Sequence, residues 1–277
     1  MAAPILVTGG TGTLGRQVVP RLRDAGCDVR VFSRPSDKGV EAGKSGEGIE
    51  LFTGDLATGE GIDAAVKGTE IIVHCAGTPK GDEVKAQHLV RAASRARARH
   101  LVFISVVGAD TIPVVSGVDR AMFGYFASKL AAEQVIAGSG LPWTTLRATQ
   151  FHDLTLATIR QLTKLPVVPV PAGWRVQPVD SGEVAARLVE LALGRPAGLV
   201  PDLGGPRIYE LADLVRSYLR AGGRHRPILP VRLPGRANRA YRAGANLTPD
   251  RAVGRRTWEE FLADQVSSPS ASGAGPT

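Results

Sequence analysis

A glycine-rich stretch near the N-terminus, residues 8–16 with the sequence TGGTGTLGR, constrains the fold more than any other feature. It lies between an apolar run at residues 4–7, which predicts a buried strand, and the start of a helical pattern. Glycine at every third position allows a tight turn, the close approach of backbone to a pyrophosphate and the packing of a helix on a strand. The stretch therefore predicts a turn that joins the first strand to the first helix.

This turn has the chemistry of a dinucleotide site. Free N–H groups and the positive dipole end of the new helix favour phosphate. The Gly-Lys-Ser/Thr ending of a nucleoside-triphosphate loop is missing from the stretch. We therefore expect a dinucleotide cofactor to contact Gly9, Thr11, Gly12, Thr13, Leu14 and Gly15.

Strand-like and helix-like segments alternate along the first half of the chain. After the glycine turn, strands are expected at residues 29–32, 49–52, 70–75, 101–105 and 143–146. Their spacing suits right-handed βαβ units, so we predict an α/β domain with a doubly wound parallel sheet over residues 1–150. Short segments broken by Gly and Pro predict a small irregular α/β lobe over residues 151–266 that covers this sheet. The composition of residues 267–277 predicts a disordered tail.

Composition narrows the class of protein. The 277 residues are 43% hydrophobic, as in ordinary globular proteins. No run is long enough to cross a bilayer and no signal peptide is evident, so we expect a cytoplasmic protein. Cys27 and Cys75 belong to no CxxC pair and are expected to be reduced core thiols. His74, His88 and His100 lack metal-ligand spacing, so no metal is expected.

The net charge of +8 raises the question of a polyanionic partner. The arginines are dispersed, densest between Arg216 and Arg256, and no zinc finger, RNP-like strand or aromatic-interleaved patch accompanies them. A solvated basic surface is the favoured interpretation, and we expect neither a nucleic acid nor a membrane partner. The expected partner is a small-molecule substrate, with a protein partner only if the role is regulatory, and the chain is expected to be a monomer or homodimer.

Residues after the second expected strand bear on the choice of cofactor. In dinucleotide folds an acidic residue about 20 positions past the glycines binds the 2′-hydroxyl of NAD. Ser33 and Arg34 stand there instead, and a hydroxyl with a guanidinium suits a 2′-phosphate. We therefore expect NADP(H) in preference to NAD(H), with added charge from Arg16 and Lys38. Two alternatives stay open: Arg34 could lie on the surface at a strand end, or Asp37 could turn inward and favour NAD.

Two further turns follow expected strands. Asp55 could accept a hydrogen bond from the adenine amino group, with Leu56 against the ring, although a helix N-cap would also explain the aspartate. Ala76, Gly77 and Thr78 are small enough to let the nicotinamide ribose pass. A simple tight turn would have the same sequence.

The pair Tyr125 and Lys129 carries the expected chemistry. The two residues are four apart in a helical pattern and so lie on one helix face. Free tyrosine has a pKa of about 10. A neighbouring ammonium stabilises the phenolate and brings such a pKa toward neutrality. The lysine could also bind ribose hydroxyls, and Ser105, at the end of the fifth major strand, could hydrogen-bond a substrate oxygen.

These motifs together resemble a known family. The order of five segments is similar to that of short-chain dehydrogenase/reductases: TGGTGTLGR, HCAG, FISVVGAD, YFASKLAAE and LRATQFHD. Their sequences most resemble those of the atypical, NmrA-like branch. The resemblance covers residues 4–200. It implies a Rossmann-type fold with Tyr125 as general acid/base, Lys129 as its partner and ribose ligand, and Ser105 as the substrate-orienting serine. The chain departs from extended members at residues 105–108, where Ser-Val-Val-Gly replaces a Ser/Thr-rich run.

The resemblance also points to a substrate pocket. Phe151 and His152 follow the sixth major strand, where family members line the nicotinamide and the substrate, so both are candidate substrate contacts. Core packing would equally explain Phe151, and a helix cap would explain His152. Trp174 and Gln177 could cover the pocket from the lobe, although a structural role is as good an account of Trp174.

Three functions are compatible with these residues. The leading hypothesis is an NADPH-dependent oxidoreductase that passes a hydride to a carbonyl or quinone-like acceptor, with Tyr125 supplying the proton. The second is a non-catalytic protein that senses the NADPH/NADP ratio, because atypical members often lose the tyrosine and act as binders. The third is a nucleotide-sugar epimerase or dehydratase, which Arg34 disfavours.

Overall fold

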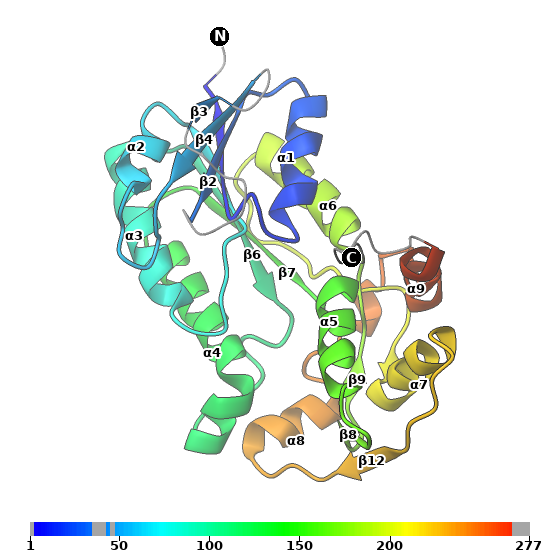
Figure 1. Cartoon of the computed structure of the whole chain (residues 1–277). Coiled ribbons are helices and arrows are strands. Elements are labelled where there is room, and N and C mark those ends of the chain that lie inside the picture. The colour runs from blue at the N-terminus through cyan, green and yellow to red at the C-terminus, as the bar shows by residue number, and fades with distance from the viewer. Residues whose placement is uncertain (1–2, 35–42, 45–47, 268–277) are drawn as a thin grey trace, which may run out of the picture.

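A doubly wound parallel sheet forms the centre of the molecule, as the alternation of segments predicts (Figure 1). The computed structural model describes residues 3–34, 43–44 and 48–267. The strand order is β10-β7-β6-β5-β1-β2-β4-β3, and only β3 (Gly43–Lys44) is antiparallel to its neighbour. The parallel strands are β1 (Ile5–Thr8), β2 (Val29–Ser33), β4 (Ile49–Thr53), β5 (Ile71–His74), β6 (His100–Val106), β7 (Trp143–Ala148) and β10 (Gly198–Leu199).

The register of the central strands brings their carboxyl ends to one edge. Thr8, the last residue of β1, lies beside Phe32 of β2 and His74 of β5. The chain runs outward from β1 through β2 to β4, then crosses back to β5 and continues outward through β6 and β7. The order therefore reverses between β1 and β5, and ligands of such sheets bind outside the carboxyl ends of the strands at that point.

Helices cover both faces of the sheet (Figure 1). On one face, α1 (Gly15–Asp24) and α6 (Ser181–Leu193) pack apolar side chains such as Val18 and Leu188 onto the strands. On the other face lie α2 (Ile62–Val66), α3 (Asp82–Arg95) and α4 (Gly117–Ala137). Because both faces are covered, the central strands are near-continuous apolar runs, and β6 is buried along its whole length.

The rest of the chain beyond residue 150 forms a lobe beside the sheet edge. Its helices are α5 (His152–Leu162), α7 (Leu211–Ala221), α8 (Arg236–Ala243), the short 3-10 helix η1 (Pro249–Arg251) and α9 (Trp258–Ser267). Two small sheets complete it, pairing β8 (Val168–Pro171) with β12 (Ile228–Val231) and β9 (Arg175–Val176) with β11 (Tyr209–Glu210). The buried core of the lobe includes Phe123 and Phe126 of α4, so this long helix contributes to both cores.

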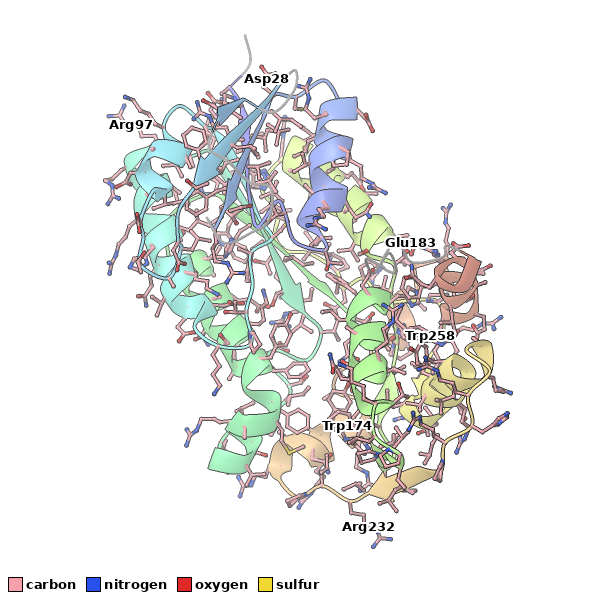
Figure 2. All side chains as sticks on the ribbon, in the orientation of Figure 1. Asp28, Arg97, Trp174, Glu183, Arg232 and Trp258 are labelled. Carbon is pink, nitrogen blue, oxygen red and sulfur yellow. The ribbon has the colours of Figure 1, made fainter. Side chains whose placement is uncertain are left out.

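Several contacts attach the lobe to the sheet layer. Asp180 caps α6 by accepting the N–H of Gly182 at 2.8 Å. Glu183 in the first turn of α6, labelled in Figure 2, accepts the backbone N–H of Arg255 at 2.9 Å. Both α6 and β10 come from beyond residue 150 yet pack with the sheet. The division of the chain at residue 150 remains a proposal, and these two elements belong spatially to the first part.

The structure also bears on the sequence predictions about membrane crossing, metal sites and cysteines. Among the described helices, none has the length and apolarity that crossing a membrane requires. In the described ranges no three metal-binding side chains gather into a possible metal site, and both cysteines are free. The tail prediction for residues 268–277, and the roles considered for Asp37 and Lys38, lie outside the described residues.

Candidate active site

A large cavity opens at the carboxyl edge of the sheet, where the strand order reverses. Its volume is about 1250 Å³, and it extends from the glycine turn to the lobe. Most residues singled out from the sequence line it. They are Gly9, Thr11, Gly12, Thr13, Leu14, Ser33, Arg34, Asp55, Leu56, Ala76, Gly77, Thr78, Ser105, Tyr125, Lys129 and Phe151. Gly15 and His152 are not part of the lining.

The glycine turn forms a cradle that side chains would fill. Gly9 has φ +69°, and a Cβ there would lie 2.8 Å from the backbone of Ala76. Gly15 lies beneath the turn, where a Cβ would come 2.2 Å from the carbonyl oxygen of Gly9. Glycine at these two positions keeps the backbone close-packed and leaves the N-terminal end of α1 facing the cavity. The turn therefore fits the diphosphate of a dinucleotide, and Gly15 supports it from below.

Positive charge surrounds this end of the cavity. Arg34 follows β2 at the rim, and the buried Ser33 hydroxyl lies 3.1 Å from the Thr11 hydroxyl. Lys80 and Lys85 also line the cavity, and the sequence analysis missed both. They belong to the segment after β5 and to α3, beyond any motif, and only their position shortly after the Ala76–Thr78 turn could have indicated them. The basic environment suits a phosphate-rich cofactor.

The Asp55 turn combines a structural and a cavity-facing role. Asp55 Oδ1 accepts the backbone N–H of Ala57 at 2.8 Å, an Asx turn that shapes the segment after β4. Both Asp55 and Leu56 line the cavity. A local role for the aspartate and a contact to adenine are therefore compatible, and the adenine contact remains a proposal.

Lys129 is held by a buried carboxylate. Its Nζ atom lies 3.2 Å from Asp82 Oδ2 and 3.2 Å from the Ile104 carbonyl oxygen, and both charged side chains are buried. Burial alone would raise the pKa of Asp82. The Lys129 ammonium and the Thr78 N–H outweigh that effect, so the pKa lies below its ordinary value. The sequence analysis missed Asp82, which stands at the start of a helix where a plain capping role is common.

Beneath this ion pair lies a neutral histidine. His74, at the end of β5, is hydrogen-bonded through Nδ1 to the Thr8 hydroxyl at 2.7 Å and stacks on Phe103. Burial, and then the charge of Lys129, lower its pKa to about 3. The imidazole therefore stays neutral near pH 7 and serves as a packing group rather than a base.

Tyr125 and Ser105 lie in the lining next to Lys129. The ring of Tyr125 meets Phe126 edge-on at 5.9 Å, and Lys129 Nζ lies 5.8 Å from the Tyr125 ring centroid. The Ser105 hydroxyl is buried at the carboxyl end of β6, and no other described group hydrogen-bonds it. The structure thus brings the three sequence-predicted catalytic residues to one cavity.

The lobe forms the far wall of the cavity. Phe151 and Trp174 line it as considered, together with Gln150 from the same segment as Phe151. Val176, Leu211 and Tyr241 also line it, and the sequence analysis did not place them there. Trp174 is labelled in Figure 2. Residues after position 200 could not be assigned to the cavity from sequence, since no local pattern connects them to it.

Two of the residues considered for this end serve the lobe instead. His152 is fully buried, stacks on Phe261 at 4.9 Å and donates through Nε2 to the Arg256 carbonyl oxygen at 3.1 Å. The prediction of a substrate contact for His152 is therefore corrected: as the first residue of α5 it points into the core. Gln177 is likewise buried, donating to the Gly205 carbonyl oxygen and accepting the Thr248 N–H, both at 2.8 Å.

Comparisons with known proteins identify the family and relatives of this chain. A family described as NAD(P)H-binding matches residues 9–194. A (4-alkanoyl-5-oxo-2,5-dihydrofuran-3-yl)methyl phosphate reductase of Streptomyces griseus is 30% identical over 222 residues, 79% of this chain and 74% of that protein. An NAD(P)H azoreductase of Xenophilus azovorans is 26% identical over 224 residues, again 79% and 74%.

Solved structures share the fold. An NADPH-dependent quinone oxidoreductase of Escherichia coli, complexed with NADPH, has a TM-score of 0.76 at 18% identity, covering 94% of this chain and 99% of that one. A triphenylmethane reductase of Citrobacter sp. has a TM-score of 0.72 at 20% identity, covering 95% and 99%. The glycine turn, the strand order and the family match lead to one conclusion: the chain belongs to the family described as NAD(P)H-binding.

Proposed function

We propose that this protein is an NADPH-dependent reductase of a carbonyl or quinone-like small molecule. The observation that carries the proposal is the meeting of Tyr125, Ser105 and Lys129 in one cavity with the glycine turn. The curated relatives described above bear the names of reductases, which supports the same class of reaction.

Ser105 and Tyr125 have distinct roles in such a reaction. When bound, NADPH supplies the hydride. The Ser105 and Tyr125 hydroxyls hydrogen-bond the substrate oxygen, and the Tyr125 phenol donates its proton to that oxygen as negative charge develops there. One hydride and one proton thus convert a carbonyl to an alcohol, and solvent restores the phenol proton.

Lys129 holds the cofactor side of the site. An ammonium has three N–H donors, and one of those on Lys129 is donated to the Ile104 carbonyl, while Asp82 Oδ2 lies 3.2 Å away as an ion-pair partner. A donor therefore remains for a ribose hydroxyl. Ser33 and Arg34, with Arg16 on the adjoining rim, support the preference for NADP(H) over NAD(H), since a hydroxyl and guanidinium groups suit a 2′-phosphate.

Removing the phenol hydroxyl tests the proposal. Tyr125→Phe should lower kcat for NADPH oxidation with a carbonyl and quinone panel by at least about 100-fold, the scale of general acid catalysis. The dissociation constant for NADPH should stay within about twofold, because the glycine turn is intact. Wild-type turnover in the variant would remove Tyr125 from the mechanism.

A second candidate, a non-catalytic sensor of the NADPH/NADP ratio, is favoured by one observation. The Lys129 ammonium lies 3.2 Å from a buried Asp82 oxygen and 5.8 Å from the Tyr125 ring centroid, so its nearest charged partner is that carboxylate, which also pairs with Lys85. This candidate predicts NADPH binding without turnover of any compound in the panel, and a protein partner whose affinity changes with the redox state of the cofactor. Turnover of a panel compound by the wild type contradicts it.

A further inference from the structure

Charge is confined to one end of the cavity. Three cationic side chains, Arg16, Arg34 and Lys80, stand at the glycine-turn end together with Asp55. Lys85 and Lys129, at the boundary, share the buried Asp82 carboxylate. Among the described residues, the lining that comes from β6, β7, α5 and the lobe contains no Asp, Glu, Lys, Arg or His. The substrate end therefore has no countercharge for an ion.

A rigid aromatic wall borders this uncharged end. The rings of Trp174 and Tyr241 lie 4.5 Å apart, and Phe123 packs against both at 5.6 and 5.7 Å. The Trp174 indole donates to Asn238 Oδ1 at 2.7 Å, which fixes its orientation. Apolar side chains continue the surface: Phe151, Leu154, Val176 and Leu211. A flat apolar ring would pack well against such a wall.

The polar groups at this end are neutral hydrogen-bonding groups. The Ser105 hydroxyl is buried and unpartnered among the described residues, and Tyr125 lines the same cavity. Gln150 accepts the Tyr241 hydroxyl on Oε1 at 3.4 Å, which orients its amide nitrogen away from that contact. Neutral donors of this kind suit carbonyl oxygens, whereas an anion here would lose its hydration without gaining an ionic partner.

Resting on the reductase function proposed above, we propose that the substrate is an uncharged, flat, conjugated carbonyl compound. Its oxygen faces Ser105 and Tyr125, and its ring packs on the Trp174 wall. The cavity separates an anionic cofactor, held at the basic end, from a neutral acceptor at the other. This site therefore discriminates against phosphate and carboxylate substituents on the acceptor.

Matched pairs of acceptors test the charge preference. One pair is a 1,4-naphthoquinone with a propanoate side chain and its methyl ester; the other is 4-formylbenzoate and its methyl ester. We expect kcat/KM with NADPH to be at least tenfold higher for the ester in any pair that is reduced. Equal or higher efficiency for the acid would overturn the proposal while leaving the reductase function standing.

If neither pair is reduced, the reductase function fails for these acceptors, and binding decides the substrate class. Titration of the NADP⁺ complex with the two naphthoquinones, followed by quenching of tryptophan fluorescence, should show at least tenfold tighter binding of the ester. Trp174→Phe should lose most of the quenching. Equal affinities for acid and ester would overturn the inference independently of turnover.

A charge introduced at the cavity mouth provides a second test. Thr158 is exposed on α5 and lines the cavity, whereas its exposed neighbour Ala157 does not. Thr158→Arg should reduce the ester-to-acid ratio of kcat/KM at least threefold, because it supplies the missing countercharge. Ala157→Arg adds the same charge to the same helix and should leave the ratio as in the wild type. Equal ratios in the two variants would contradict the inference.

Discussion

At the scale of single residues, the proposed preference for NADP(H) depends on the two residues at the end of β2. Ser33 is fixed by its contact with Thr11, while Arg34 reaches the cavity rim. Arg34→Ala should weaken NADPH binding about 10- to 100-fold, since a hydrogen bond to a charged group contributes about 1.5–3 kcal/mol. The dissociation constant for NADH, which lacks the 2′-phosphate, should change less than about twofold. Both dissociation constants follow from the fluorescence of the reduced nucleotides on titration.

A control separates this contact from general charge. Arg91 is exposed on α3 and is not part of the cavity lining. Arg91→Ala removes the same net charge and should leave the ratio of the NADPH and NADH constants unchanged. If Arg34→Ala also leaves that ratio unchanged, the preference for NADP(H) does not come from Arg34.

At the scale of elements, one side chain joins α4 to α8. Asp119 accepts the backbone N–H and the hydroxyl of Ser116, forming the capping box of α4, and it also accepts the N–H of Ala237 in the first turn of α8 at 3.2 Å. Helix α8 carries Asn238 and Tyr241, the residues that hold Trp174 in the cavity wall. The start of α4 therefore influences the position of the wall.

Two substitutions separate these contacts. Ser116→Ala removes only the cap of α4 and should lower the free energy of unfolding by about 1 kcal/mol. Asp119→Ala also frees the first turn of α8 and should lower stability further, while raising KM for the acceptor relative to the Kd for NADPH. Urea unfolding and steady-state kinetics measure the two effects. Equal losses in both variants would show that the α8 contact contributes nothing.

At the scale of the whole molecule, buried neutral histidines make stability depend on pH. Burial lowers the pKa of His74 to about 3, with help from Lys129, and burial also lowers the pKa values of His100 and His152. An unfolded histidine has a pKa of about 6.5. Below that pH the unfolded chain binds more protons than the folded one, so stability falls as the pH falls.

The melting temperature should therefore decrease steadily from pH 6.5 toward pH 4. Each such histidine contributes up to about 1.4 kcal/mol per pH unit in this window. His74→Gln should reduce the slope of this dependence, because one of the three histidines that take up a proton on unfolding is gone. Thr8→Val removes only the hydrogen-bonding partner and should lower the melting temperature at every pH without flattening the curve. An unchanged slope in His74→Gln would contradict this account.

Much of the fold follows from local sequence patterns. The strands around residues 29–32, 49–52, 101–105 and 143–146 and the helix over Tyr125 and Lys129 could be predicted because periodicity and breakers act over a few residues. The lobe could be outlined only coarsely, since its short strands pair with segments far along the chain, as β8 does with β12. For the same reason, local patterns did not indicate that α6 packs on the sheet or that β10 pairs with β7.

The sequence by itself determined the glycine turn, the alternation that forms a parallel sheet, and the placement of Tyr125 and Lys129 on one helix face, because each depends on residues a few positions apart. Only the tertiary structure decided that Phe151 faces the cavity while His152 turns into the core, that Asp82 pairs with Lys129, and that Trp174 meets Tyr241 in one wall. These contacts join segments from different parts of the chain. Side-chain burial there is set by packing between elements, which no local pattern records.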